Sequence, residues 1–230
     1  AHVATPAGDV GVAFVGAGNF ATASLLPPLK RLSNVRLTGV ATSSGLTARS
    51  VADKFQFAFT ASGINQIVDD ASTTCVFVAT RHNLHHSLAA RALDAGKAVF
   101  VEKPLALDRD GLREVVTAAR KSGRPLLTGF NRRFAPLARQ IHERFANRVG
   151  PMIVSFRVNA GFVPREHWTQ DPVEGGGRII GEACHFIDFV QFLTGSTPVR
   201  VSATAVRSGN ARETNADSVA VALELSDGSV

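Results

Sequence analysis

The chain has 230 residues, of which 45% are hydrophobic and 19% charged, a globular composition long enough for one large domain or two smaller ones. No run of about 18 apolar residues occurs, so no membrane span is predicted. A net charge of +6 raises nucleic-acid binding as a hypothesis, but the basic residues are scattered and no nucleic-acid partner is predicted.

The start of the chain and its cysteines bear on the cellular compartment. Residues 1–9 are small and polar, without a signal-peptide pattern, and are interpreted as a linker. Cys75 and Cys184 lie in separate predicted elements. No disulfide framework is therefore predicted, and a cytoplasmic location is expected.

A dinucleotide-binding pattern follows. The predicted strand Val10–Val15 runs into Gly16-Ala17-Gly18-Asn19-Phe20-Ala21, which fits G-x-G-x-x-G/A. The first glycine allows a tight turn, the second lets backbone approach a pyrophosphate, and the small third residue lets a helix pack on the strand. The helix N-terminus would bind the pyrophosphate, and Pro27-Pro28 should end or kink that helix.

The end of the second predicted strand, Val35–Ala41, bears on the choice of cofactor. Rossmann folds that bind NAD usually carry Asp or Glu there for the ribose 2′-hydroxyl. Here Thr42, Ser43 and Ser44 follow, and Arg49 lies one turn further on. Hydroxyl and N–H groups at a helix start suit a 2′-phosphate, so NADP is favoured over NAD. The alternative is that the two serines only cap the helix predicted at 46–55.

Three histidines lie after the strand predicted at 75–79, which follows a short strand predicted at 57–60. Asn83 is predicted to cap a helix that ends at Gly96. His82, His85 and His86 cannot all face one point on a helix, so no metal site is predicted. His85 is expected to be a polar contact in the cofactor loop.

The strand predicted at 98–101 ends in Glu102-Lys103-Pro104. Ligands of open α/β sheets bind beyond the carboxyl ends of the strands, where Glu102 and Lys103 would lie. The alternative is a surface Glu-Lys pair in a loop. A helix capped by Asp108 and a strand at 125–130 complete an alternation that indicates a doubly wound parallel sheet.

Composition changes after residue 130, where a helix is predicted to about residue 148. Long strands predicted at 152–160, 199–207 and 218–225 indicate an open, mainly antiparallel sheet. We predict an α/β chain: a Rossmann domain over 10–130, then a C-terminally incomplete α+β domain for substrate binding and dimerisation over 131–230. Asp227-Gly228 is a strong hairpin signal, so the chain is expected to be a piece of a longer one.

Taken together, the motifs resemble the glucose–fructose oxidoreductase / inositol dehydrogenase / MocA family. The matching stretches are residues 16–21, Ala79-Thr80 with Leu84-His85, Ala95-Gly96-Lys97 leading to Glu102-Lys103-Pro104, and Gly175-Gly176-Gly177 before His185. Residues 129–134 and 178–188 resemble a subgroup in which this module follows a zinc-type alcohol dehydrogenase-like half. The resemblance implies a Rossmann domain, a C-terminal sheet often used for dimerisation, and NAD(P)-dependent oxidation or reduction of sugars, polyols and related carbonyl compounds.

The resemblance also implies residue roles. Lys103 would be the catalytic lysine, Glu102 would lie by the nicotinamide ribose, the peptide before Pro104 would be cis, and His185 would transfer the proton. Many relatives carry Asp four residues before this histidine, whereas here Gly181 stands there with Glu182 beside it. Glu182 could pair with His185 at i,i+3, or Asp188 could orient the imidazole instead.

Lysine and histidine suit the chemistry, because removing a hydroxyl proton needs a base with a pKa near the working pH. The predicted catalytic residues are Lys103, His185 and Glu182. The predicted cofactor-binding residues are Gly16, Gly18, Asn19, Phe20, Thr42, Ser43, Ser44, Thr80, Arg81, His85, Glu102, Lys103, Asn131 and Arg132. The predicted substrate-binding residues, which could line a polar sugar site, are Arg133, Arg165, His167, Trp168 and Arg178.

A second hypothesis is a dinucleotide-binding module without its own catalysis, the regulatory or scaffolding half of a larger protein. Gly181 and the missing C-terminal strands favour it, whereas Lys103 and His185 together favour an enzyme. In either case a homo-oligomer formed through the C-terminal sheet is expected.

Overall fold

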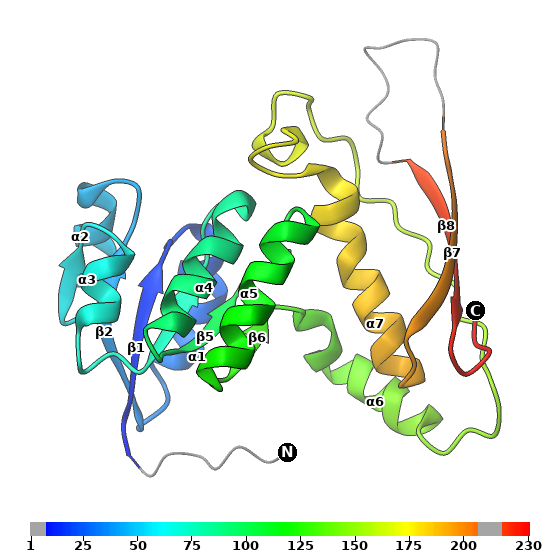
Figure 1. The fold of residues 1–230 in the computed structure, drawn as a ribbon, viewed down its shortest axis with the longest axis horizontal. Helices are drawn as coiled ribbons and strands as arrows, with labels where there is room; N and C mark the ends of the chain where they lie inside the picture. The colour runs from blue at the N-terminus through cyan, green and yellow to red at the C-terminus, as the bar shows by residue number, and fades with distance from the viewer. Residues whose placement is uncertain (1–7, 207–217) are drawn as a thin grey trace. The chain divides into compact units, whose positions relative to one another are not determined.

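The computed structural model describes residues 8–206 and 218–230 and divides into two compact units, Ala1–Gly129 and Phe130–Val230 (Figure 1). The first unit contains a six-stranded sheet, and the second contains a two-stranded one. Among the described residues no helix has the length and apolar character needed to cross a membrane.

The sheet of the first unit is parallel throughout. Its strands are β1 (Val10–Val15), β2 (Val35–Ala41), β3 (Phe59–Ala61), β4 (Cys75–Val78), β5 (Ala98–Val101) and β6 (Leu126–Thr128). They lie in the order β3-β2-β1-β4-β5-β6, so the strand order reverses between β1 and β4. This is the doubly wound order that binds dinucleotides at the reversal point, and it confirms the predicted fold class of this part.

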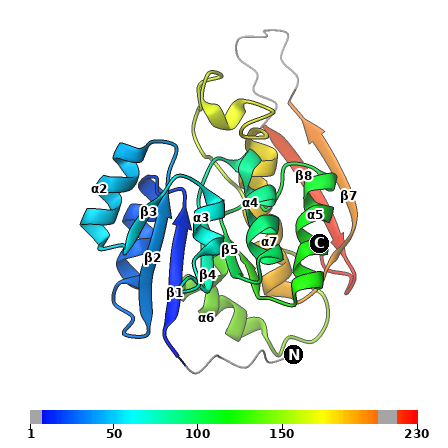
Figure 2. The same ribbon diagram turned by 60° about the vertical axis from the view of Figure 1, so that its left-hand side comes forward.

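Helices cover both faces of this sheet: α1 (Leu26–Leu29), α2 (Gly45–Phe55), α3 (Ile64–Asp69), α4 (His85–Asp94) and α5 (Arg109–Ser122) (Figure 2). Alternate strand residues face opposite sides. Phe14 and Val40 therefore pack with Leu26 of α1 and Phe55 of α2 in one core cluster. The opposite cluster joins strands β1, β4 and β5 to α3, α4 and α5.

Local signals predicted most of these helix ends. Asp108 accepts a hydrogen bond from the Gly111 N–H at 2.7 Å and caps α5, as predicted. The cap prediction for Asn83 is wrong: this residue lies in a 3-10 turn, His82–Leu84, and α4 begins after Leu84 without a side-chain cap bond. The backbone of residues 82–84 is already in a 3-10 turn, so Asn83 does not lie at the N-cap position of α4.

The second unit contains α6 (Pro136–Phe145), α7 (Cys184–Thr194) and the antiparallel strands β7 (Pro198–Ala205) and β8 (Val219–Leu225). The turn predicted at Asp227-Gly228 forms, with the Gly228 N–H donating to the Leu225 carbonyl at 2.9 Å.

The prediction of a strand at residues 152–160 is wrong, because this segment forms no strand in the structure. Its start lies beside Val230, which exchanges hydrogen bonds with the Met152 carbonyl (3.0 Å) and the Val154 N–H (2.9 Å). The rest of the segment belongs to neither sheet in the described part of the chain. A strand is defined by its ladder to a neighbour, so an extended sequence alone is not enough.

Candidate functional site

The loops that leave β1, β2, β4 and β5 share one edge of the parallel sheet, because the carboxyl ends of parallel strands point the same way. These loops carry residues 16–21, Thr42–Ser44, Thr80–Arg81 and Glu102–Lys103. The reversal between β1 and β4 lies at the middle of this edge. It is the position where open α/β sheets bind ligands.

The two motif glycines meet different surroundings. Gly16 has a φ of +86°, and a side chain there would come within 2.4 Å of the Ala79 carbonyl oxygen, so the loops after β1 and β4 touch. A side chain at Gly18 would meet no atom of the described chain within 4 Å. Ala21 is 1% exposed, as expected of the small residue between helix and strand. Gly16 thus closes the turn, whereas Gly18 leaves open surface beside a helix start.

That open surface fits the pyrophosphate of a dinucleotide. The helical turn begins at Asn19 and continues through a π turn, Ala21–Leu25, into α1. Helix starts present N–H groups toward anions, and the exposed Asn19 and Phe20 lie there. The residues present therefore fit the phosphate part of the cofactor.

The loop after β2 holds three small hydroxyl residues. The Thr42 hydroxyl donates to the Ser44 carbonyl at 2.6 Å, while the Ser43 and Ser44 side chains are exposed. Ser44 precedes α2 but makes no side-chain cap bond. Arg49 pairs with Asp53 through its Nε at 3.1 Å. The exposed Ser43 and Ser44 hydroxyls are accessible to a ligand, and the role of this loop stays a prediction.

His85 is buried beneath the loops after β4 and β5. Its Nδ1 lies 2.7 Å from the Pro104 carbonyl oxygen, and its Nε2 lies 3.2 Å from the Thr80 carbonyl oxygen. Burial lowers the pKa of His85 below its ordinary 6.5, although both carbonyls oppose the shift. The side chain is 0% exposed, and its contacts in the structure are therefore with the protein. The cofactor contact expected of it stays a prediction.

Glu102 and Lys103 follow β5 at the same edge of the sheet. Burial raises the pKa of Glu102 from 4.5 to about 7, against the hydrogen bond from the Lys103 N–H to its Oε2 at 3.3 Å. A side chain at Gly129 would come within 2.8 Å of Oε1, so the small residue after β6 leaves room for this carboxyl group. The Lys103-Pro104 peptide is cis, as the resemblance implied. An acid that titrates near neutral pH is typical of functional sites.

In the second unit, His185 lies in the first turn of α7 and is 6% exposed. Glu182 belongs to a π turn, Ile179–Ala183, that precedes α7. The α-helical spacing assumed for these two residues therefore does not hold, because a π turn advances by a different angle per residue. Asp188 is also buried, but both of its oxygens accept hydrogen bonds from Arg133.

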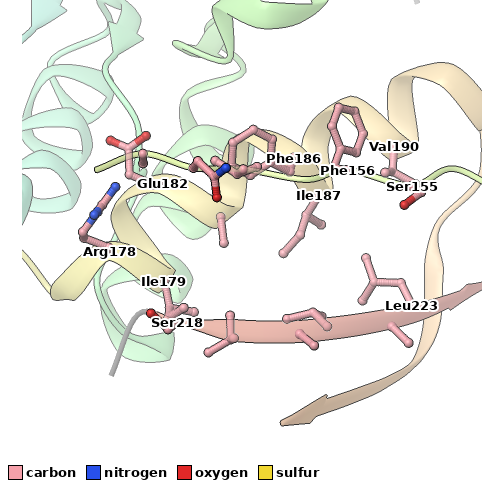
Figure 3. A pocket seen from close by; sticks show the side chains of 18 of the residues that line it. Ser155, Phe156, Arg178, Ile179, Glu182, Phe186, Ile187, Val190, Ser218 and Leu223 are labelled. Atoms are coloured by element: carbon pink, nitrogen blue, oxygen red, sulfur yellow. The ribbon is translucent and has the colours of Figure 1, made fainter. Parts of the chain in front are cut away.

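A groove of about 1380 Å³ runs along the same unit between α7, β8 and residues 153–163. Figure 3 shows Arg178 and Glu182 at one end of it and the apolar Ile187, Val190 and Leu223 along the rest. Arg178 donates to the Gly161 carbonyl at 2.9 Å, and Arg132 also lines the groove. Three predicted site residues, Arg132, Arg178 and Glu182, thus line one largely apolar groove.

The remaining predicted residues of this unit lie outside the groove's lining. Trp168 starts a 3-10 turn, Trp168–Gln170, is half-buried, and has its ring 5.9 Å from that of His167. Arg165 and Asn131 are exposed. Gly175 packs against this turn, since a side chain there would come within 2.4 Å of the Trp168 carbonyl oxygen. A substrate role for these side chains stays a prediction.

The strand order, the two glycines and the open helix start define a dinucleotide-binding chain of the Rossmann class. A family profile described as an oxidoreductase family with an NAD-binding Rossmann fold matches residues 10–130, and a GFO/IDH/MocA C-terminal domain matches residues 144–230. The chain belongs to this GFO/IDH/MocA oxidoreductase family, which confirms the resemblance.

Relatives and solved structures agree with this assignment. The chain is 30% identical over 169 residues to a 1,5-anhydro-D-fructose reductase of Ensifer adhaerens, covering 72% of this chain and 51% of the relative. It is 34% identical over 167 residues to inositol 2-dehydrogenase 2 of Saccharopolyspora erythraea, covering 70% and 47%. The chain thus spans about half the length of these relatives.

Two solved structures share the fold. GenD2 from gentamicin A biosynthesis, in complex with NAD, superposes with a TM-score of 0.80 at 24% identity, covering 100% of this chain and 66% of that one. The aldose-aldose oxidoreductase of Caulobacter crescentus superposes with a TM-score of 0.79 at 20% identity, covering 96% and 69%. At these identities the likeness establishes the fold alone.

Proposed function

We propose that this chain is the catalytic module of an NAD(P)-dependent oxidoreductase that transfers a hydride between the nicotinamide and a sugar, polyol or related carbonyl compound. The observation that carries the proposal lies at the carboxyl end of the parallel sheet. There the open surface at Gly18 follows β1 and Glu102-Lys103 follows β5, with β4 between the two strands. The named activities of the relatives, a reductase and an inositol dehydrogenase, support the substrate class.

The nicotinamide, when bound, supplies or accepts the hydride. In the proposed mechanism Lys103 takes the proton of the reacting hydroxyl during oxidation and returns it during reduction, and His185 relays this same proton. Glu102 contributes a carboxyl group that is half-protonated near neutral pH. A group with a pKa close to the working pH is an efficient proton donor and acceptor, because it can both release and take up a proton at that pH.

Within this proposal NADP is the preferred cofactor. Support comes from the exposed Ser43 and Ser44, which occupy the position where an acid would repel a 2′-phosphate. We further propose a homo-oligomer formed through β7 and β8, since Val199, Val201 and Val221 are 66%, 63% and 47% exposed there. In the described part of the chain Cys75 and Cys184 are not joined in a disulfide, which supports a reducing, cytoplasmic location.

The test is the titration of NADPH fluorescence against the chain, the Gly18→Val variant and a control, Gly63→Val. Both glycines have open space around them, so both variants should fold. We expect a Kd of about 1–100 μM for the wild type and the control, roughly −5.5 to −8 kcal/mol, and no saturable binding by Gly18→Val. Equal binding by all three would contradict the assignment of this loop.

The competing function is a dinucleotide-binding module without catalysis, which Gly181 favours because the family resemblance implies an acid at this position. The two functions separate when turnover of sugars and polyols is assayed alongside binding. Binding without turnover by the longest natural chain that contains this module would support the competing function.

A further inference from the structure

The segment Phe130–Arg133 holds α7 through a buried ion pair. The Arg133 Nε donates to Asp188 Oδ2 at 3.0 Å, and a second guanidinium nitrogen donates to Oδ1. The Asp188 side chain is only 8% exposed, and that of Arg133 is 35% exposed. The guanidinium also lies 5.7 Å from the Phe192 ring centre. A bidentate ion pair of this kind fixes the relative orientation of the two side chains as well as pairing their charges.

Two further contacts join the same segment to the first turn of α7. The Phe130 ring meets the His185 ring edge-on, with centres 6.1 Å apart and planes at 75°. The Arg132 guanidinium lies 4.8 Å from the Phe186 ring centre. His185 thus has a neighbour on this segment, and the Asp188 ion pair is one turn further along α7.

We propose that Arg133 is a positioning residue, which together with Asp188 sets the orientation and protonation of His185. This inference rests on the proposed function, in which His185 transfers a proton. It replaces the substrate contact expected of Arg133, since two nitrogens of its guanidinium already bond Asp188.

The electrostatic consequence has a definite sign. The charged groups on the segments that contact His185 are Glu182 and Asp188 on its own helical segment, and Arg132 and Arg133 on the segment that carries Phe130. Removing Arg133 leaves the Asp188 carboxylate uncompensated one helical turn from His185, which favours the imidazolium. Removing the Asp188 charge leaves Arg133 uncompensated and favours the neutral ring.

The test follows the His185 ring in the 230-residue chain by NMR across pH, with the signal assigned from His185→Gln. We expect Arg133→Met to raise the His185 pKa and Asp188→Asn to lower it, each by about one pH unit, while the double variant returns toward the wild-type value. In Arg133→Lys the His185 pKa should lie between those of the wild type and Arg133→Met, because lysine keeps the charge but cannot make the bidentate contact with Asp188.

The control is Arg148→Met. Arg148 bonds the Thr194 carbonyl and Asp227 at 2.7 Å each, so its loss should destabilise the same unit without moving the His185 titration. Shifts of the same sign in both single variants, or no shift in either, would overturn the inference. The same variants are then assayed for the pH dependence of kcat in the longest natural chain. NMR shifts without a matching movement of kcat would leave the positioning intact and contradict the role of His185 in the proposed function.

Discussion

Replacing Glu102 by glutamine should stabilise the chain at alkaline pH. Burial raises the pKa of Glu102 from 4.5 to about 7, so the folded state holds this proton more tightly than the unfolded state does. The free energy of unfolding therefore falls as pH rises from about 4.5 to about 7 and stays lowered above that. Glutamine carries no charge and removes this loss while keeping nearly the same size.

The magnitude follows from the difference between the two pKa values. At 1.36 kcal/mol per pH unit, the change from 4.5 to about 7 corresponds to about 3 kcal/mol. The side chain is only half-buried, so solvent screening reduces the expected effect to about 1–2 kcal/mol. Glu102→Gln should be more stable than the wild type by this amount at pH 8 and equally stable at pH 4.5.

The assay is urea unfolding followed by circular dichroism at pH 4.5, 6, 7 and 8. Glu143→Gln, at an exposed position of α6, is the matched control and should change stability little at every pH. A gain for Glu102→Gln that is the same at pH 4.5 and pH 8 would refute the reasoning. A loss at pH 8 would do so as well, since it would mean that the ionised carboxylate stabilises the fold.

Four further outcomes are expected. Gly16→Ala should lower stability by about 1–3 kcal/mol in urea unfolding, because its φ is +86° and its new methyl group would overlap Ala79; an unchanged midpoint would contradict this. Ser43→Asp should reverse a preference for NADP over NAD in paired titrations; tighter binding of NAD than of NADP by the wild type would contradict this interpretation of the loop. Burial lowers the pKa of His85, so the folded chain should lose stability as pH falls below 6.5, where the unfolded chain binds this proton more tightly. His85→Gln should therefore flatten the acid side of a Tm–pH profile. Lys103→Met should abolish turnover by the longest natural chain with nearly unchanged cofactor affinity, and residual activity near wild type would exclude it as the catalytic base.

Much of the Rossmann unit could be predicted because its signals are local. The glycines of residues 16–21, the apolar runs at β4 and β5, and the Asp108 cap each act within a few residues of themselves. The alternation of strand and helix then predicts a parallel doubly wound sheet, whereas the order β3-β2-β1-β4-β5-β6 comes from the structure. The position of Glu102 at the sheet edge was predictable for the same reason, but its raised pKa was not, since that depends on burial beside Gly129.

The second unit depended on tertiary structure to a greater degree. A regular helix was the default expectation around Glu182, and only the packed chain contains the π turn at Ile179–Ala183. Residues 152–160 have the composition of a strand, but pairing requires a neighbour that composition cannot specify. Arg133 was predicted to bind substrate because of its charge. Its ion pair with Asp188 could not be predicted, since the two residues are 55 positions apart in the sequence. Contacts between distant residues form only when the chain is folded, because their energy depends on geometry that no local pattern encodes.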